Sequence, residues 1–216
     1  MACLIDYLHS SSFKSDEFCR SLECFDEILI SKLKAYVGEL ESKHTLIVLH
    51  QLGSHGPTYY KRVPETLKKF RPECATAELN TCSRDEILNA YDNTIYYTDY
   101  ILGQLIDFLK TQEDRFETSM LYVSDHGEST GEYGLYLHGM PYAFAPSEQT
   151  HVPMFAWLSQ EYALSKKIDR GCMDLVAKNT FSHDNLFHTL LNMTDVKTNE
   201  YIPEMSVFDG CTGDSP

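Results

Sequence analysis

Long apolar runs are missing from this 216-residue chain, and so is a leader-like N-terminus. Its longest apolar stretches, such as residues 46–49, fall far short of the roughly 20 residues that a membrane-spanning helix needs. The first residues do not place a basic segment before an apolar one, as a secretory signal peptide does. We therefore expect no membrane span within these residues, and an exported protein would carry its exporting segment elsewhere.

Positive charge is scarce as well. The chain has 18 Lys and Arg against 32 Asp and Glu, a formal net charge of −14, and no basic cluster stands out. Binding to the phosphate backbone of nucleic acid is therefore not expected. A hydrophobic fraction of 43% and a charged fraction of 23% are typical of one globular domain with a substantial core, and not of a disordered chain.

The seven cysteines contain no C-x-x-C pair, which argues against a zinc ribbon or a thioredoxin-type motif. Cys19 and Cys24 are five residues apart in polar, loop-like sequence. Cys74 and Cys82 are eight apart in similar sequence. Short-loop disulfides formed in an oxidising compartment are the leading interpretation, and seven reduced thiols are the alternative. The remaining cysteines, of which one must lack a partner within the chain, are Cys3, Cys172 and Cys211.

Apolar residues at three- and four-residue steps predict three amphipathic helices, over residues 22–40, 83–110 and 182–193. The first should end near Gly38. The second begins with the capping box Ser83-Arg84-Asp85-Glu86, and its stripe from Leu88 to Leu109 should face the core. Short apolar runs predict three strands, over residues 45–49, 119–124 and 153–158, and the first is expected to be buried on both faces.

Strands that alternate with long amphipathic helices predict an α/β fold, an αβα sandwich with a largely parallel central sheet. In such sheets ligands bind beyond the carboxyl ends of the strands. His50 and His55 follow one predicted strand, and Asp125 and His126 follow another. The titratable side chains therefore gather where this fold places a site.

Asp125 and His126 put a carboxylate and an imidazole side by side, and oxygen and nitrogen ligands suit a borderline metal such as Zn²⁺. An isolated Asp-His pair is more often only a polar surface feature. Here His55, His126 and His138 each have a glycine neighbour, which allows close backbone or ligand approach. We expect these three histidines and Asp125 to converge at the carboxyl edge of the sheet, and His50 to be a packed strand-end residue outside the site.

Five motifs in unbroken order point to a known family. They are His50-Gln51-Leu52-Gly53-Ser54-His55-Gly56-Pro57, Tyr91-Asp92-Asn93-Thr94, Ser124-Asp125-His126-Gly127-Glu128-Ser129, Leu137-His138-Gly139-Met140-Pro141 and Val152-Pro153-Met154. Together they resemble the periplasmic domain of bacterial lipid A phosphoethanolamine transferases. That family includes the mobile colistin-resistance enzymes and belongs to the alkaline phosphatase and sulfatase superfamily. The resemblance covers roughly residues 20–195.

The resemblance implies a zinc-dependent enzyme that transfers phosphoethanolamine from phosphatidylethanolamine to lipid A or a similar surface acceptor, through a phosphorylated threonine. Asp125 and His126 match the motif that ligates the catalytic zinc. His55 and His138 match catalytic histidines that hold the phosphoryl group of the substrate or a second zinc. The implied location is the periplasmic side of the bacterial inner membrane, and the implied oligomeric state is a monomer.

The main departure from the family pattern is an absence. The family places its transmembrane helices, one zinc-binding glutamate and the nucleophilic threonine before the region at which Met1 begins, and this chain has no counterpart for them. We therefore expect residues 1–216 to be the carboxy-terminal part of a sulfatase-like catalytic domain, incomplete at its N-terminus and inactive alone. Membrane attachment would come from the absent N-terminal domain.

The resemblance also bears on the cysteines, because Cys74 and Cys82 match a disulfide position of the family. Cys3 would then pair with a cysteine upstream of this chain. Two other functions stay open on the residues alone. One is a phosphatase- or sulfatase-type hydrolase of the same superfamily, which would share Asp125 and His126. The other is a non-catalytic, zinc-binding fragment.

Overall fold

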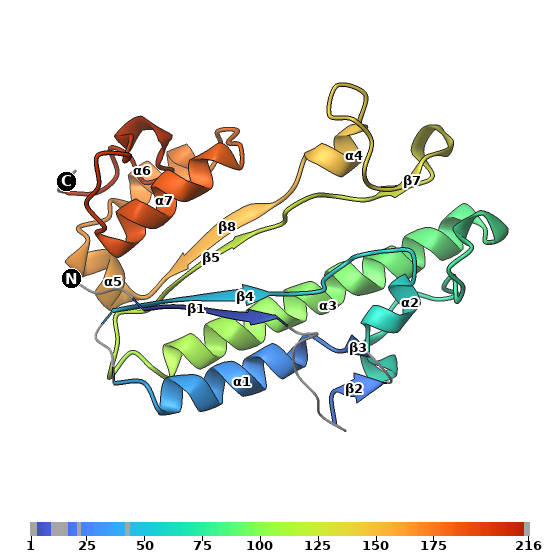
Figure 1. The fold of residues 1–216 in the computed structure, drawn as a ribbon, viewed down its shortest axis with the longest axis horizontal. Helices are drawn as coiled ribbons and strands as arrows, with labels where there is room; N and C mark the ends of the chain where they lie inside the picture. The colour runs from blue at the N-terminus through green and yellow to red at the C-terminus, as the bar shows by residue number, and fades with distance from the viewer. Residues whose placement is uncertain (1–3, 10–16, 21–22, 42–43, 214–216) are drawn as a thin grey trace. The chain divides into compact units, whose positions relative to one another are not determined.

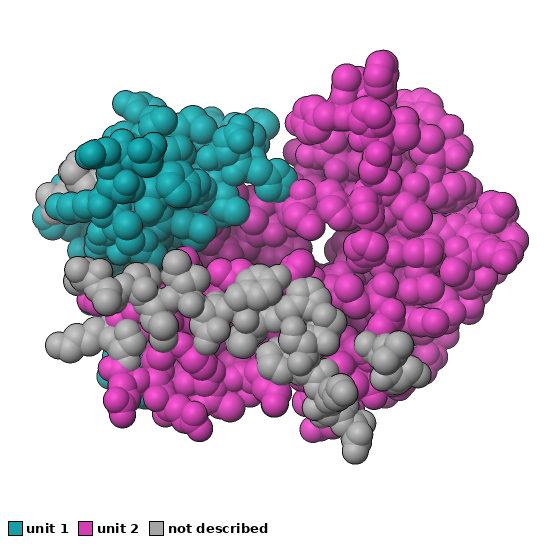
Figure 2. All heavy atoms as spheres, in the orientation of Figure 1, with its two compact units in different colours: residues 1–2, 109–120, 156–216 teal, residues 3–108, 121–155 magenta. Residues whose placement is uncertain are grey.

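The computed structural model describes residues 4–9, 17–20, 23–41 and 44–213 of the chain (Figure 1). The chain forms two compact units, which Figure 2 distinguishes by colour. The larger unit contains residues 3–108 and 121–155, and the smaller unit contains residues 1–2, 109–120 and 156–216. All of the predicted site residues belong to the larger unit.

Helices and strands alternate along the chain, as the sequence pattern predicts. The strands are β1 (Leu4–His9), β2 (Cys19–Arg20), β3 (Glu23–Cys24), β4 (Thr45–His50), β5 (Ser119–Val123), β6 (Ser129–Thr130), β7 (Tyr136–Leu137) and β8 (Met154–Leu158). The α-helices are α1 (Glu27–Gly38), α2 (Tyr59–Arg62), α3 (Arg84–Lys110), α4 (Ser147–Thr150), α5 (Gln160–Ser165), α6 (Arg170–Val176) and α7 (Asp184–Thr194). Short 3-10 turns are η2 (Glu65–Leu67), η3 (Leu79–Thr81), η4 (Glu132–Gly134) and η5 (Pro203–Met205).

The strands β1 and β4 pair in parallel over all six residues of each. The helices α1 and α3 run along this pair (Figure 1). Leu49 of β4 packs against Ile28 and Leu29 of α1. The hydroxyl of Tyr97 on α3 donates to Glu27 of α1 at 3.2 Å, which links the two helices. The larger unit is thus built as a helix layer on a parallel strand pair, in agreement with the predicted α/β class.

The strands β5 and β8 also pair, and they run in opposite directions to each other. The amide of Ser124 donates to the carbonyl of Pro153, and the amide of Ser159 donates to the carbonyl of Thr118. The end of β5 therefore lies beside the start of β8, and the pair is antiparallel. The connection, residues 124–153, contains short strands, a 3-10 turn and the four-residue helix α4, and an antiparallel pair needs no longer crossover helix. The expected parallel arrangement is thus met by β1 and β4 and not by this pair.

The capping box at the start of α3 forms as expected. The amide of Ser83 donates to Oε2 of Glu86 at 2.8 Å, and the amide of Glu86 donates to Oγ of Ser83 at 3.3 Å. These reciprocal bonds satisfy amides that a helix start leaves without intrahelical partners. The helix then continues to Lys110, as the periodicity predicts.

The buried face of α3 is offset from the predicted stripe. Of that stripe only Leu102 and Leu105 are buried, and Ile95 is 48% exposed. The residues that are buried are Ile87, Ala90, Asn93, Thr94, Tyr97, Ile101, Leu102 and Leu105. The helix has two adjacent apolar stripes, and the buried one is the stripe that contains Asn93. Its side chain is fully buried and hydrogen-bonds the backbone of Lys69 and Phe70.

The strand β4 is less buried than its apolar run predicts. Its side chains are half-buried or exposed, and Val48 is 38% exposed. The expectation of burial on both faces is therefore wrong for the residues that the structure describes. Leu49 packs against the buried cluster that includes Ile28 and Leu29 of α1, so an apolar run predicted the strand correctly but not its degree of burial.

Three disulfides link six of the cysteines. The predicted pairs Cys19–Cys24 and Cys74–Cys82 are both confirmed. The third bridge joins two cysteines that sequence reasoning left unassigned, Cys172 and Cys211. Cys3 lies outside the described residues. The bridges agree with an oxidising compartment and exclude the alternative of seven reduced thiols.

The Cys172–Cys211 bridge closes a 39-residue separation within the smaller unit, whereas Cys19 and Cys24 are separated by five residues. Because a longer closed loop restricts the unfolded chain more, the double substitution Cys172→Ser with Cys211→Ser should cost about 4 kcal/mol of unfolding free energy, against about 2 kcal/mol for the shorter bridge. Urea unfolding followed by the fluorescence of Trp157, which belongs to the smaller unit, measures the first loss, and circular dichroism measures the second. Equal losses would show that loop length does not govern these stabilities.

Candidate metal centre

Three histidines from separate loops of the larger unit converge on one point. His55 follows β4, His126 follows β5 and His138 follows β7. One ring nitrogen of each lies within 4.8 Å of those of the other two. The ring centroids of His126 and His138 are 3.9 Å apart, and those of His55 and His138 are 5.0 Å apart. The structure thus brings together three of the four side chains that the sequence singles out.

Backbone carbonyls fix the proton position on two of these rings. Nδ1 of His55 lies 2.7 Å from the carbonyl oxygen of Gly56. Nδ1 of His126 lies 3.0 Å from the carbonyl oxygen of Gly127. A carbonyl oxygen only accepts, so Nδ1 must carry the proton in both rings, and each neutral ring keeps its lone pair on Nε2. Lone pairs on Nε2 are the donors that a metal ion requires.

The third ring is held by a buried acid that sequence reasoning missed. Nδ1 of His138 lies 3.0 Å from Oε1 of Glu128, whose side chain is 3% exposed. The same acid accepts from the amide of Gly56 and from the hydroxyl of Tyr59, each at 3.2 Å. Burial, together with the charge of Glu128, raises the pKa of Tyr59 well above its usual range, so this hydroxyl remains a donor.

Asp125 lies beside this cluster, and its side chain is mostly outside it. Oδ2 of Asp125 is 3.9 Å from Nε2 of His126, and the side chain is 79% exposed. Its Oδ1 accepts the amide of His126 at 3.1 Å. An exposed carboxylate next to a lone pair on Nε2 offers an oxygen ligand on the solvent side of the histidines.

The loop that carries His55 is hydrogen-bonded to Asp26, the residue before α1. The carboxylate of Asp26 is buried and accepts the amides of Leu52 and Gly53, both at 2.9 Å. Gly53 has a φ of +56°, which a residue with a side chain rarely adopts. A bidentate anchor at this turn fixes where the chain leaves β4 and hence where His55 lies.

Gly127, next to His126, is required by close packing. A Cβ atom at this position would lie 2.0 Å from the carbonyl oxygen of Glu148. Its amide also donates to the carbonyl of Gln149 at 3.0 Å. The glycine therefore lets the loop after β5 lie directly against α4, as expected for a glycine beside a site histidine.

His50 lies at the last position of β4 and outside the histidine cluster, as predicted. Its side chain is exposed, so the expectation that it is packed is wrong. The strand ladder ends at this residue, opposite His9, which leaves the position at an open strand end.

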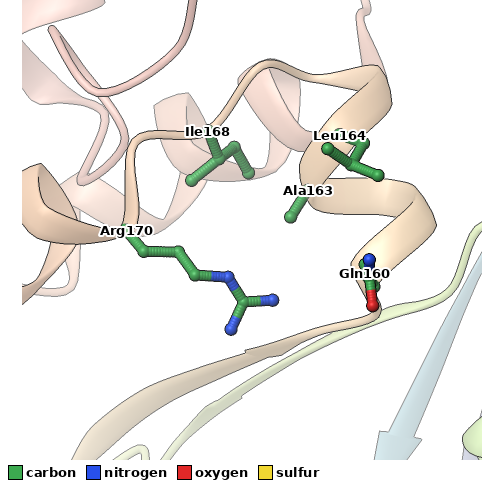
Figure 3. A pocket seen from close by; sticks show the side chains of 5 residues that line it. All are labelled: Gln160, Ala163, Leu164, Ile168 and Arg170. Atoms are coloured by element: carbon green, nitrogen blue, oxygen red, sulfur yellow. The ribbon is translucent and has the colours of Figure 1, made fainter.

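A hollow of about 490 Å³ lies in the smaller unit, which contains none of the predicted site residues. It is lined by Gln160, Ala163, Leu164, Ile168 and Arg170. In Figure 3 the side chain of Arg170 extends toward Gln160. Its lining contains a single titratable side chain and offers no acid–base pair or metal ligands, so the histidine cluster is the better candidate site.

The match to a family model decides the classification. The sulfatase model matches residues 6–196, which is most of the chain and includes every residue of the histidine cluster. The chain belongs to the sulfatase family. This sulfatase-family chain therefore has the fold class that its sequence predicts.

The relatives of this sulfatase-family chain are phosphoethanolamine transferases. It is 46% identical over 194 residues to phosphoethanolamine transferase EptA of Escherichia coli strain K12, covering 89% of this chain and 35% of the relative. It is 43% identical over 174 residues to phosphatidylethanolamine transferase Mcr-1 of Escherichia coli, covering 81% of this chain and 31% of the relative. The chain thus spans about a third of the length of the curated relatives that it matches. The predicted resemblance is confirmed.

A solved structure shows the same fold. The soluble domain of lipooligosaccharide phosphoethanolamine transferase A from Neisseria meningitidis superposes with a TM-score of 0.92 at 38% identity, over 97% of this sulfatase-family chain and 68% of that chain. Among the described residues of the present chain, none of the helices is both long and apolar enough to cross a bilayer.

Proposed function

We propose that this chain supplies the histidine side of the active site of a zinc-dependent phosphoethanolamine transferase. In the whole protein, phosphatidylethanolamine is the donor, and lipid A or a related surface glycolipid is the acceptor. The reaction takes place on the periplasmic side of the bacterial inner membrane, in a protein that is a monomer. The observation that carries the proposal is the convergence of three imidazoles within 4.8 Å, in a chain 46% identical to a phosphoethanolamine transferase.

The donor set fits zinc. Two of the three rings present an unprotonated Nε2 because backbone carbonyls occupy their Nδ1, and imidazole nitrogen is a preferred zinc ligand. Asp125 and His126 would hold the zinc, and His55 and His138 would hold a second zinc or the phosphoryl group.

Zinc at this site would supply Lewis acidity toward the phosphoryl oxygens and lower the pKa of a hydroxyl nucleophile. The histidines of this chain orient the phosphoryl group and exchange protons with its oxygens. The first transfer breaks the bond between phosphorus and the glycerol oxygen and forms a bond to a threonine oxygen, releasing diacylglycerol. The second transfer passes the phosphoethanolamine group from the threonine to an acceptor oxygen. That threonine would lie in a portion of the relatives that this chain does not match.

The test compares this chain with a version extended to the full length of the relatives, using a fluorescent phosphatidylethanolamine and lipid A in detergent. The extended protein should release diacylglycerol and produce phosphoethanolamine-modified lipid A, whereas this chain alone should take up zinc without turnover. Substituting His138→Ala in the extended protein should abolish product formation. A matched control is His183→Ala, at an exposed histidine of the smaller unit.

Two outcomes would contradict the proposal. Release of free phosphoethanolamine to water, with no modified lipid A, would identify a hydrolase of the same superfamily. Turnover by this chain alone that disappears on Asp125→Ala would show that the nucleophile lies within these 216 residues. A zinc-bound water acting as in a hydrolase is the chemical alternative in that case.

A further inference from the structure

The side chain of Glu128 is the most deeply buried carboxylate near the histidine cluster, and no part of the transfer chemistry uses it. The residue is 5% exposed and precedes β6. A buried carboxylate is costly unless donors surround it. Three donor groups do so here, and they come from the loop after β4, from α2 and from the residue after β7.

The contacts of Glu128 divide between its two oxygens. Oε1 accepts the amide of Gly56 at 3.2 Å and faces Nδ1 of His138 at 3.0 Å. Oε2 accepts the hydroxyl of Tyr59 at 3.2 Å. Gly56 directly follows His55 in the chain. One carboxylate therefore joins the backbone beside one cluster histidine to the ring of another.

We infer that Glu128 is a positioning residue that keeps the proton of His138 on Nδ1 and so directs the Nε2 lone pair into the metal centre. The proton position follows from the geometry, whereas its effect on zinc binding rests on the proposed function. In metal sites, a carboxylate that holds the second nitrogen of a ligating histidine fixes the orientation of the ring, and its loss typically weakens metal binding about 10- to 100-fold.

The geometry explains why the acid is needed at His138 in particular. His55 and His126 each have a backbone carbonyl against Nδ1, contributed by the next residue in the chain. For His138, Nδ1 instead faces the side chain of Glu128. Its ring orientation therefore depends on a replaceable residue, whereas the other two orientations are set by the backbone.

The packing around Glu128 makes this arrangement rigid. Tyr59 is 1% exposed and belongs to a core cluster with Cys74, Leu79, Ile87 and Ala90. Leu137, which directly precedes His138, packs against the same cluster. Tyr59 thus holds Oε2 of the carboxylate from the core side, while Oε1 holds the ring of His138.

The test uses the metal-free 216-residue chain labelled with ¹⁵N in its histidines. Two-bond proton–nitrogen correlations report which ring nitrogen of His138 carries the proton. In the unsubstituted chain the proton should be on Nδ1. In Glu128→Leu, which removes the acceptor that faces Nδ1, the proton of His138 should no longer be confined to Nδ1 and should populate Nε2, while His55 and His126 keep theirs on Nδ1. Zinc affinity, measured by competition with a chelator, should fall about 10- to 100-fold in the same variant.

Tyr59→Phe is the matched control, because it removes one donor to Glu128 and leaves the carboxylate facing His138. It should leave the proton of His138 on Nδ1. A proton on Nε2 of His138 in the unsubstituted chain would overturn the inference, even if Glu128→Leu fails to fold. An unchanged proton position and zinc affinity in a folded Glu128→Leu would overturn it as well. A chain with the proton on Nδ1 that takes up no zinc would support the proton position and overturn the proposed function.

Discussion

Substituting His126→Ala should weaken zinc binding by more than about 100-fold, since losing a residue that only orients a ligand already costs about 10- to 100-fold. His126 is the ring nearest to His138, with centroids 3.9 Å apart, and the one beside the carboxylate of Asp125. Its removal therefore takes away the donor shared by the histidine cluster and the Asp-His motif. Chelator competition and the zinc content of the purified chain measure the loss.

The fold should survive this substitution, because the side chain of His126 is 31% exposed and its backbone contacts do not depend on the ring. The hydroxyl of Ser124 donates to the carbonyl of residue 126 at 2.8 Å, and that bond remains in the variant. We expect the free energy of unfolding to change by less than about 1 kcal/mol. His183→Ala should change neither quantity. Retention of zinc by His126→Ala, with the affinity of the unsubstituted chain, would mean that the cluster is not the metal site.

The parts of the site that the sequence predicted are those that depend on local signals. A histidine after a strand and next to a glycine is visible in the sequence, and His55 and His126 meet that description, while His138 is marked by its neighbouring glycine alone. The rule that ligands bind at strand ends then places them together. The spacing of cysteines similarly indicated both short-loop disulfides, because closing a short loop requires no knowledge of the fold.

The parts that sequence reasoning missed depend on contacts between distant segments. Glu128 contacts a tyrosine 69 residues away and a glycine amide 72 residues away, and nothing in the run Ser124 to Ser129 separates it from an ordinary surface acid. Cys172 and Cys211 are 39 residues apart, with no local signal to pair them. A short apolar run predicts a strand but not its neighbours, which is why the antiparallel pairing of β5 with β8 was not predicted.

Asn93 illustrates the same limit on the long helix α3. Apolar periodicity placed the core face on the stripe that includes Ile95. The neighbouring stripe, which contains the buried side chain of Asn93, faces the core instead. An asparagine is a poor helix former and normally lies on the surface, so pattern reasoning treats it as exposed. Its burial is favourable only because the backbone of residues 69–70 supplies partners for both ends of the amide.

Substituting Asn93→Ala should therefore be among the most destabilising single changes in the larger unit. We expect it to lower the free energy of unfolding by about 3 kcal/mol. Oδ1 of Asn93 accepts the amides of Lys69 and Phe70 at 2.7 and 2.8 Å. Nδ2 donates to the carbonyl of Phe70 at 2.9 Å and to Glu73 at 3.1 Å. Alanine leaves four partly buried hydrogen-bonding groups without this side chain, and it also leaves a cavity at the fully buried position 93.

The measurement is hydrogen exchange of the amides of Lys69 and Phe70, which reports the local loss directly. A loss of about 3 kcal/mol corresponds to exchange that is faster by roughly 100-fold or more. Asn89→Ala is the matched control, one turn earlier on the same helix, where the side-chain amide makes an exposed hydrogen bond to the carbonyl of Pro72 at 2.7 Å. That variant should lose no more than about 1 kcal/mol, since an exposed partner is satisfied by water. Equal losses at the two positions would show that burial of the amide does not set the face that α3 turns to the core.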